Sequence, residues 1–203
     1  MNNTIYSKLL LMLLALYTAR SPVIAQQKVQ VVTKSISRNF TGINCLNPVI
    51  SAEKSTIIVN GWDKNELKVT IRLISKNIDR KKAELDLAIL KYTIKENNQS
   101  IQFSNFFDNE EKDNGISSNL SACYELWCPV NSKIQITNLY GEITMKTFTG
   151  EISIKSGFCK LLLSQINGKL TMESSYDNLN TERSNLICKI NADKTDMTTL
   201  ISI

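Results

Sequence analysis

The sequence predicts a mainly β protein: a β-solenoid, or β-helix, that follows an irregular N-terminal β region carrying one short α-helix. The main observation is a nine-residue repeat that runs from Pro129 to the C-terminus. Each repeat has apolar residues at its sixth and eighth positions and mostly polar residues beside them, an alternation typical of a strand with one buried face. A fixed short period of this kind is typical of stacked repeat proteins. The second observation is that the region before Pro129 contains several strand-like stretches but a single good helix signal.

Two sets of positions in the repeat define the expected core and the expected corners. We expect the side chains at the sixth and eighth positions to be buried. They are Ile134/Ile136, Ile143/Met145, Ile152/Ile154, Leu161/Leu163, Leu170/Met172, Leu179/Thr181, Cys188/Ile190 and Met197/Thr199. The fourth position holds Gly141, Gly150 and Gly168, which we interpret as tight corners where glycine permits a positive φ. Each repeat is thus predicted to be one corner and one strand of about five residues.

Charges at the polar positions indicate which strands are neighbours. Direct stacking of successive repeats would set Glu142 beside Glu151, and like charges on neighbouring strands are unfavourable. Stacking at an offset of eighteen residues instead sets Glu142 beside Lys160 and Lys155 beside Glu173. An antiparallel meander also brings some opposite charges together, but it places Lys155 against Lys160. The charge pattern therefore favours an eighteen-residue parallel solenoid, with the meander as the alternative.

The first 25 residues have the features of an export signal. Lys8 supplies a positive charge, residues 9–16 form a short apolar run, and Val23 and Ala25 occupy the small-residue positions of a cleavage site. The apolar run is too short to span a bilayer, which takes about twenty residues, and a retained anchor is the alternative. We therefore predict a protein exported to the periplasm or the cell surface that is not transmembrane once the signal is removed.

The charge of the chain does not indicate a nucleic-acid partner. The net charge of +5 over 203 residues is mild, and the densest basic run is Arg80-Lys81-Lys82. No aromatic residues interleave with this run, which lies in the helical stretch. We interpret it as a solvated helix face in preference to a patch for phosphate or an anionic glycan.

Residues 26–128 form a separate, less regular region in this interpretation. The predicted elements are strand pieces at 29–31 and 35–37, a hairpin of 55–61 with 66–74, a helix over 79–90, a hairpin of 92–94 with 100–106, and a strand at 122–128. Asp79 is the expected N-cap of the helix, and Ala83, Leu87 and Leu90 fall on one of its faces. The predicted division is therefore 1–25 signal peptide, 26–128 N-terminal β-rich region and 129–203 nonapeptide-repeat β-solenoid.

Five cysteines in an exported chain leave at least one thiol free. Cys123 and Cys128 lie five residues apart in a strand-like stretch, on opposite faces, and cannot bridge each other. Cys188 takes an inward position and is expected in the core, Cys159 takes a corner position, and Cys45 in a loop is the freest to find a partner. Buried thiols are the main interpretation, with one bridge left open. Because the chain has no His and no C-x-x-C pair, we predict no metal site.

The sequence contains no specific signal for a catalytic site. Nucleophile activation by His is excluded because the chain has none. Asp63, Glu66, Glu142 and Glu151 could supply a pair of carboxylates, but any set of 19 acids offers such pairs. We predict no catalytic residues, no cofactor and no enzymatic activity.

Two further features are weighed as binding sites. The acidic loop of residues 108–115 has Lys112 where the calcium-binding loop motif needs another oxygen, so a solvated loop is favoured. Trp62 and Trp127 could be exposed binding aromatics. Residues of this kind more often pack on a sheet, and this is the interpretation we prefer.

Several stretches in order carry a family resemblance. Val59-Asn60-Gly61-Trp62-Asp63 is followed by an amphipathic helix, then by Tyr124-Glu125-Leu126 and Pro129-Val130-Asn131, which lead into the glycine-punctuated repeats. The chain resembles the putative adhesin family of bacterial envelope proteins, an exported β-solenoid domain of unknown function. The resemblance implies a non-enzymatic, adhesin-like interaction or structural module and transfers no site residues. The alternative is a carbohydrate-binding or carbohydrate-active β-helix protein, an analogy from fold alone.

The end of the chain departs from the regular repeat. Asp177, Leu186 and Thr195 replace glycine at the fourth position, and residues 197–203 are largely apolar and uncharged. The last turn of a solenoid exposes unpaired backbone groups unless a cap or another chain covers them. We therefore expect self-association, or docking onto an envelope partner, through the C-terminal solenoid edge.

Overall fold

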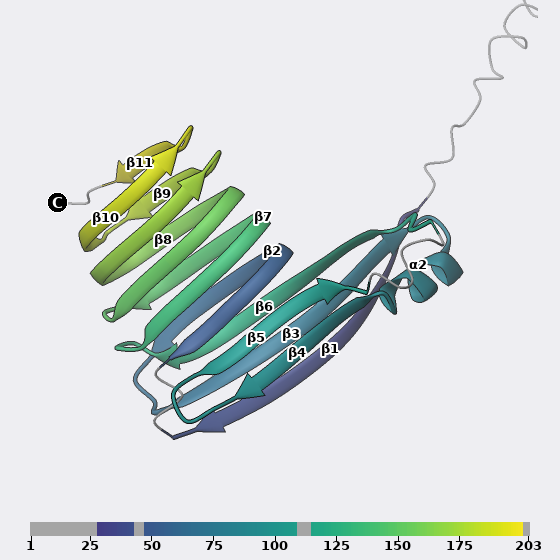
Figure 1. Ribbon diagram of the computed structural model, residues 1–203, viewed down its shortest axis with the longest axis horizontal. Helices are drawn as coiled ribbons and strands as arrows, with labels where there is room; N and C mark the ends of the chain where they lie inside the picture. Colours follow the sequence, from purple (N-terminus) through teal and green to yellow (C-terminus); the bar gives the residue numbers. More distant parts are fainter. Residues whose placement is uncertain (1–27, 43–46, 109–114, 201–203) are drawn as a thin grey trace, which may run out of the picture.

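The computed structural model describes residues 28–42, 47–108 and 115–200. These residues form one open, mixed sheet of eleven strands and a single helix (Figure 1). The elements are β1 Gln30–Thr41, β2 Pro48–Trp62, β3 Glu66–Asn77, α2 Arg80–Leu87, β4 Leu90–Glu96, β5 Ile101–Phe107, β6 Asn119–Pro129, β7 Lys133–Phe148, β8 Glu151–Ser175, β9 Asn178–Glu182, β10 Asn185–Asp193 and β11 Asp196–Leu200. The predicted export signal at 1–25 and Cys45 lie outside the described residues.

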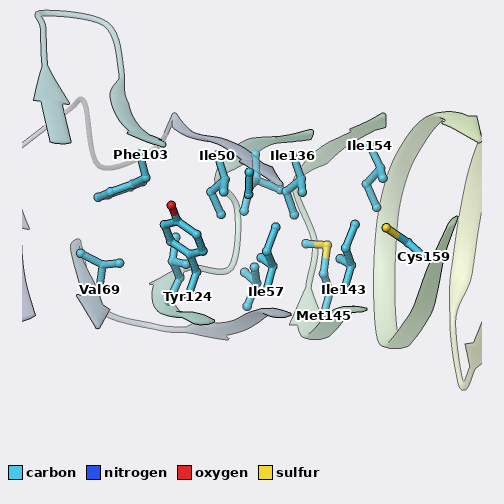
Figure 2. Packing of buried hydrophobic residues seen from close by; sticks show 14 of the residues in the cluster. Ile50, Ile57, Val69, Phe103, Tyr124, Ile136, Ile143, Met145, Ile154 and Cys159 are labelled. Atoms are coloured by element: carbon cyan, nitrogen blue, oxygen red, sulfur yellow. The ribbon is translucent and has the colours of Figure 1, made fainter. Parts of the chain in front are cut away.

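The long strands β2, β7 and β8 bend, so that each contributes to both of two facing layers. The first layer contains residues 48–53, 133–139, 151–157 and 169–175 together with β5 and β10, and the second contains β6, residues 55–62, 141–146 and 159–164, β9 and β11. Figure 2 shows Ile50, Ile136 and Ile154 on one side of the core, opposite Ile57 and Ile143 on the other. The core therefore lies between the layers and runs along the length of the molecule.

Successive turns of chain pair in parallel at an offset of eighteen residues. Ile136 is in register with Ile154, and Ile143 is in register with Leu161. The predicted charge partners also meet, because the Lys155 Nζ lies 3.1 Å from the Glu173 Oε2. The eighteen-residue parallel register predicted from charge is confirmed, and the antiparallel meander is not the arrangement of residues 133–200. We call these residues, with β2, the parallel stack.

The predicted core positions are buried over most of the parallel stack but not at its end. All twelve positions from Ile134 to Thr181 are buried. The prediction is wrong for the last two repeats, where Cys188 and Met197 are exposed and Ile190 is half-buried. Among the described residues, β10 pairs only with β8 and β11 only with β9. The side chains at this end therefore lack a further described turn of chain to cover them.

Two of the three repeat glycines have a different cause from the one predicted. Of Gly141, Gly150 and Gly168, only Gly141 has a positive φ, at 145°. A Cβ at Gly150 would overlap the carbonyl oxygen of Ser132, and one at Gly168 would overlap that of Gly150. Glycine is required at Gly150 and Gly168 because the backbone of the neighbouring turn approaches too closely there for a side chain.

The predicted hairpin of residues 55–61 with 66–74 is wrong. Both segments are strands, but β6 lies between them, parallel to β2 and antiparallel to β3. Leu126 of β6 is completely buried between Val59 of β2 and Val69 of β3, and Tyr124 is completely buried between Ile57 and Ile71. Pairing with β6 therefore extends the apolar core in a way that a local hairpin would not.

The remaining N-terminal elements follow the prediction more closely. The hairpin of β4 with β5 and the strand at β6 are confirmed, whereas the two pieces at 29–31 and 35–37 belong to one strand, β1. Asp79 caps α2 by accepting from the N–H groups of Lys81 and Lys82. The helix ends at Leu87, short of the predicted residue 90, because Leu90 begins β4 and is buried. The pairing of β2 with β7 makes the sheet continuous across residue 128. The predicted domain boundary between residues 128 and 129 stays a prediction.

Candidate interaction surfaces

An aromatic residue recurs at one corner of the parallel stack every eighteen residues. Tyr140, Phe158 and Tyr176 occupy equivalent positions on successive turns, where the chain passes from the first layer to the second. All three have a positive φ angle: 62° for Tyr140, 55° for Phe158 and 58° for Tyr176. This left-handed backbone turns each side chain outward at the bend.

The three rings stack on one another along the corner. Ring centroids are 5.1 Å apart for Tyr140 and Phe158 and 4.9 Å apart for Phe158 and Tyr176, with interplanar angles of 17° and 4°. The residues are 44%, 51% and 46% exposed, in chain order. We call these three residues the aromatic ladder. Its spacing follows the separation of neighbouring strands, which is close to 4.8 Å.

Charged residues flank the aromatic ladder at both ends. The Lys194 Nζ lies 4.9 Å from the centre of the Tyr176 ring and donates a hydrogen bond of 2.9 Å to the Tyr176 hydroxyl. At the opposite end Lys54, which also has a positive φ, places its ammonium 5.5 Å from the ring centre of Phe107. Leu139, 43% exposed, adds an aliphatic group beside Tyr140. The corner is thus an apolar stripe between two lysines.

Local stability gives no clear reason for aromatic residues at this corner. A left-handed backbone costs a non-glycine residue about 1–2 kcal/mol, and glycine or asparagine adopts it more readily. Each stacked pair contributes about 0.5–1.5 kcal/mol. The stacking offsets part of the backbone cost and leaves three large rings in contact with solvent, a feature typical of interaction surfaces.

The stacking also limits what the ladder can bind. Both faces of Phe158 are covered by its neighbours, and one face of Tyr176 is covered by Lys194. A sugar that stacks on an aromatic residue needs an open ring face, whereas a protein surface can pack against ring edges and aliphatic groups. The exposed edges of the aromatic ladder and Leu139 therefore suit a protein partner better than a glycan.

A buried polar cluster lies at the inner side of the same corner. The Asp177 carboxylate accepts from the Ser156 hydroxyl at 2.6 Å, the Ser174 hydroxyl at 2.5 Å and the Cys159 N–H at 2.7 Å. Thr195 on the next turn hydrogen-bonds the Ser174 hydroxyl at 2.8 Å. Every oxygen of the carboxylate thus has a protein donor, which is the arrangement of a structural group and not of a reactive one.

Glu142 and Glu151, two of the carboxylates weighed from the sequence for catalysis, are not brought together. Glu142 lies on the outer face of the second layer, whereas Glu151 lies on the outer face of the first and pairs with Lys133 at 3.4 Å. Within the described ranges, no cluster of His, Cys, Asp or Glu could hold a metal ion. Most of the acidic loop, residues 109–114, lies outside them.

The cysteines are partly where the sequence predicts. Cys123 and Cys128 lie on opposite faces of β6, as predicted, and Cys159 takes its corner position. Cys188 is exposed and not in the core, because it lies on β10 at the end of the parallel stack. Burial raises the pKa of Cys128 to about 12, and burial together with the charge of Asp177 raises that of Cys159 to about 11.

No helix among the described residues has the length and apolar character needed to cross a membrane. Arg80-Lys81-Lys82 is exposed on α2, in agreement with a solvated helix face, and Arg80 pairs with Glu84 at 2.9 Å.

Comparisons with known proteins give structural neighbours alone. No protein-family model and no curated protein matches the chain. Among solved structures, it is similar to a "putative cell adhesion protein" from Clostridium sporogenes, with 6% identity, a TM-score of 0.39, and coverage of 83% of this chain and 99% of that one. It is also similar to a "putative adhesin" from Parabacteroides distasonis, with 8% identity, a TM-score of 0.27, and coverage of 84% and 97%. A "putative lipid binding protein" from the same organism gives 9% identity, a TM-score of 0.32, and coverage of 82% and 78%.

The aromatic ladder was not predicted from the sequence. The signal was present: the third position of alternate repeats reads Tyr140, Phe158, Tyr176 and Lys194.

Proposed function

We propose that this protein is an exported, non-enzymatic, adhesin-like interaction module whose aromatic ladder binds a protein of the cell envelope. The observation that carries the proposal is the stack of three exposed rings at left-handed positions, where smaller residues would cost less. The lysines at the two ends of the stripe limit its length and add polar contacts at its rim. An apolar centre with a polar rim is the usual organisation of a protein–protein interface.

The proposal includes a β-solenoid fold for the parallel stack and a location in the periplasm or at the cell surface. The eighteen-residue parallel register supports the fold assignment, because each turn contributes one strand to each layer. The location is supported by the sequence features of residues 1–25. A rigid stack suits an interaction module, since it holds the three rings at fixed positions on one corner.

The test measures retention of the labelled mature protein on isolated cell envelopes of the producing organism. Phe158→Asn removes the central ring and keeps a residue that tolerates left-handed backbone. We expect it to weaken retention more than about tenfold, as for the loss of a central aromatic contact. Gln165→Asn is the matched control, because Gln165 is exposed at the opposite corner with a φ of 57°. It should leave retention unchanged.

Treating the envelopes identifies the class of partner. Protease digestion should abolish retention if the partner is a protein. Retention that survives protease but not polysaccharide digestion, or that is equal for Phe158→Asn and wild type, would contradict the proposal. Turnover of a glycan by the purified protein would overturn its non-enzymatic part.

We further propose that the end of the parallel stack associates with a second copy of the chain. The support is the exposure of Cys188 and Met197, at positions buried in earlier turns, together with the single strand neighbour that β10 and β11 each have among the described residues. Exposed strand edges of this kind pair readily with other chains.

A further inference from the structure

A second surface, distinct from the aromatic ladder, contains both tryptophans of the chain. Trp62 ends β2 and Trp127 lies on β6, with ring centroids 5.8 Å apart and an interplanar angle of 40°. The Trp62 Nε1 donates a hydrogen bond of 2.9 Å to the carbonyl oxygen of Glu66, which fixes its ring at the end of the strand. Trp127 is 38% exposed. The pair therefore presents an ordered aromatic surface to solvent.

The strand register places Trp127 in a straight row of side chains across the second layer and β1 and β3. In order from β1 to β8, the row consists of Asn39, Lys68, Trp127, Asn60, Lys146 and Ser164. Their neighbours along each strand, such as Val69 and Met145, are buried, so the row lies on the outer face. With strands about 4.8 Å apart, the row is about 24 Å long.

The row carries positive charge beside its aromatic residue. Lys68 and Lys146 are exposed, and neither forms an ion pair with any residue that the structure describes. Lys64 lies next to the row, with its Nζ 4.9 Å from the Trp62 ring centre and 3.8 Å from the Glu66 carboxylate. Two cations are thus available to a ligand on either side of Trp127.

The acids nearest to the row do not neutralise it. Glu125, two residues before Trp127 on β6, pairs with Arg72 at 3.4 Å. Glu182 follows Ser164 in the register and lies beyond the end of the row, on β9. The cationic stretch is therefore limited to the strands from β3 to β7.

We propose that this row binds a linear anionic polysaccharide laid across the strands. Lys68 and Lys146 would pair with its carboxylate or sulfate groups, Asn39 and Asn60 would hydrogen-bond its hydroxyl groups, and Trp127 would pack against the apolar face of a sugar ring. Charge complementarity selects an anionic polymer, and the straight row of alternating cationic, aromatic and amide groups selects an extended one. The proposal concerns a different face of the molecule from the aromatic ladder and does not depend on it.

The chain provides its own probe for this surface, because Trp62 and Trp127 are its only two tryptophans. Titration of the mature protein with polygalacturonate should change the tryptophan emission in a saturable way, and added salt should weaken the binding. Lys68→Gln and Lys146→Gln should each weaken binding about two- to fivefold, as expected for exposed ion pairs. Trp127→Ala, followed by calorimetry, should weaken it more than about tenfold.

Matched controls separate a polysaccharide site from general attraction of polyanions. Lys160→Gln removes a charge from the same face, where Lys160 is in register with Glu142, and should leave the affinity unchanged. Polyglutamate and neutral dextran should bind at least about tenfold more weakly than polygalacturonate. The proposal is overturned by equal affinity for polyglutamate, by equal affinity of the Lys68→Gln and Lys146→Gln variants and wild type, or by the absence of binding to polygalacturonate. Lys146→Gln keeps the test valid even if Trp127→Ala fails to fold, since Lys146 is exposed.

Discussion

The carboxylate of Asp177 is buried at the fourth position of its repeat, where earlier repeats have serine, glycine or cysteine. It binds the Cys159 N–H on the preceding turn and the hydroxyls of Ser156 and Ser174. One side chain thus connects two turns of the parallel stack at the corner that carries the aromatic ladder. Hydrogen bonds to a charged acceptor are stronger than those between neutral groups. Buried donors that lose such an acceptor destabilise the folded state.

Replacement of Asp177 tests this connection. Asp177→Ala removes the acceptor of three buried donors and should lower the free energy of unfolding by about 2–4 kcal/mol. Asp177→Asn keeps one acceptor oxygen and should cost less than the alanine variant. Urea unfolding followed by circular dichroism measures both, with exposed Asn178→Ala as a control expected to cost under about 0.5 kcal/mol. A cost for Asp177→Ala no larger than the control would show that the cluster does not stabilise the fold.

The four described cysteines differ in burial, so we expect them to differ in reactivity. Cys128 and Cys159 are buried, with pKa values raised to about 12 and about 11, so little thiolate exists near neutral pH. Cys123 is also buried, whereas Cys188 is exposed. Of these four, native alkylation at pH 8 should modify Cys188 first and the other three only after unfolding. Mass spectrometry of the alkylated peptides measures the order, and modification of Cys128 at the rate of Cys188 would contradict it.

At the scale of the strand, the glycines of the repeat set how closely successive turns can approach. Gly150 has no room for a Cβ because the Ser132 carbonyl occupies that space. Gly157, on the same strand, would place a Cβ 2.9 Å from the terminal Cδ1 of Leu139, a flexible and exposed side chain. Neither has a positive φ. The two positions therefore differ in the stiffness of the neighbouring group and not in backbone conformation.

This difference gives a paired prediction. Gly150→Ala should destabilise the protein by about 2–3 kcal/mol, because backbone of the neighbouring turn must shift. Gly157→Ala should cost under about 1 kcal/mol, since the Leu139 side chain can move aside. Thermal or urea unfolding of the two variants decides between them. Equal costs would mean that close approach of the turns is not the reason for glycine at the fourth position.

Most individual strands could be predicted from the sequence, since alternation is a local property. The stretch at residues 66–74 alternates clearly and is a strand, as predicted. Its partner could not be predicted, because insertion of β6 between β2 and β3 depends on contacts between residues more than forty positions apart. The helix was predicted with its cap but too long, since its last predicted residue is buried in β4. Pairing thus depends on tertiary packing that a local pattern does not contain.

At the scale of the whole molecule, the regular spacing of charges made the strand register predictable. The two candidate sites depend instead on where the chain bends between layers and on the pairing of many strands. Glu173 could be matched with Lys155 because both lie at the same position of their repeats. The aromatic ladder follows from the same eighteen-residue period once its corner is known. The row around Trp127 has no period at all, since its residues come from six strands, and it could be recognised only from the structure.

The regular stack also has a consequence at its last described strands. Positions that are buried in earlier turns are exposed on β10 and β11, where Cys188 is exposed and Met197 is 48% exposed. Association of two copies at this end would cover these side chains and give each strand edge a partner. The N-terminal half of the molecule, with α2, lies far from this end (Figure 1), so a substitution there should not affect the association.

We therefore expect the mature protein to self-associate in a concentration-dependent way through β10 and β11. Ile190→Lys or Met197→Lys should weaken the association about tenfold or more, because each places a charge at an inward position of the last turn. Ile78→Lys, at a residue 58% exposed beside α2, makes the same chemical change at the opposite end and should have no effect. Sedimentation velocity over a range of concentrations measures all three variants against wild type. A wild-type protein that stays monomeric at high concentration, or association weakened equally by Ile78→Lys, would contradict docking at this end.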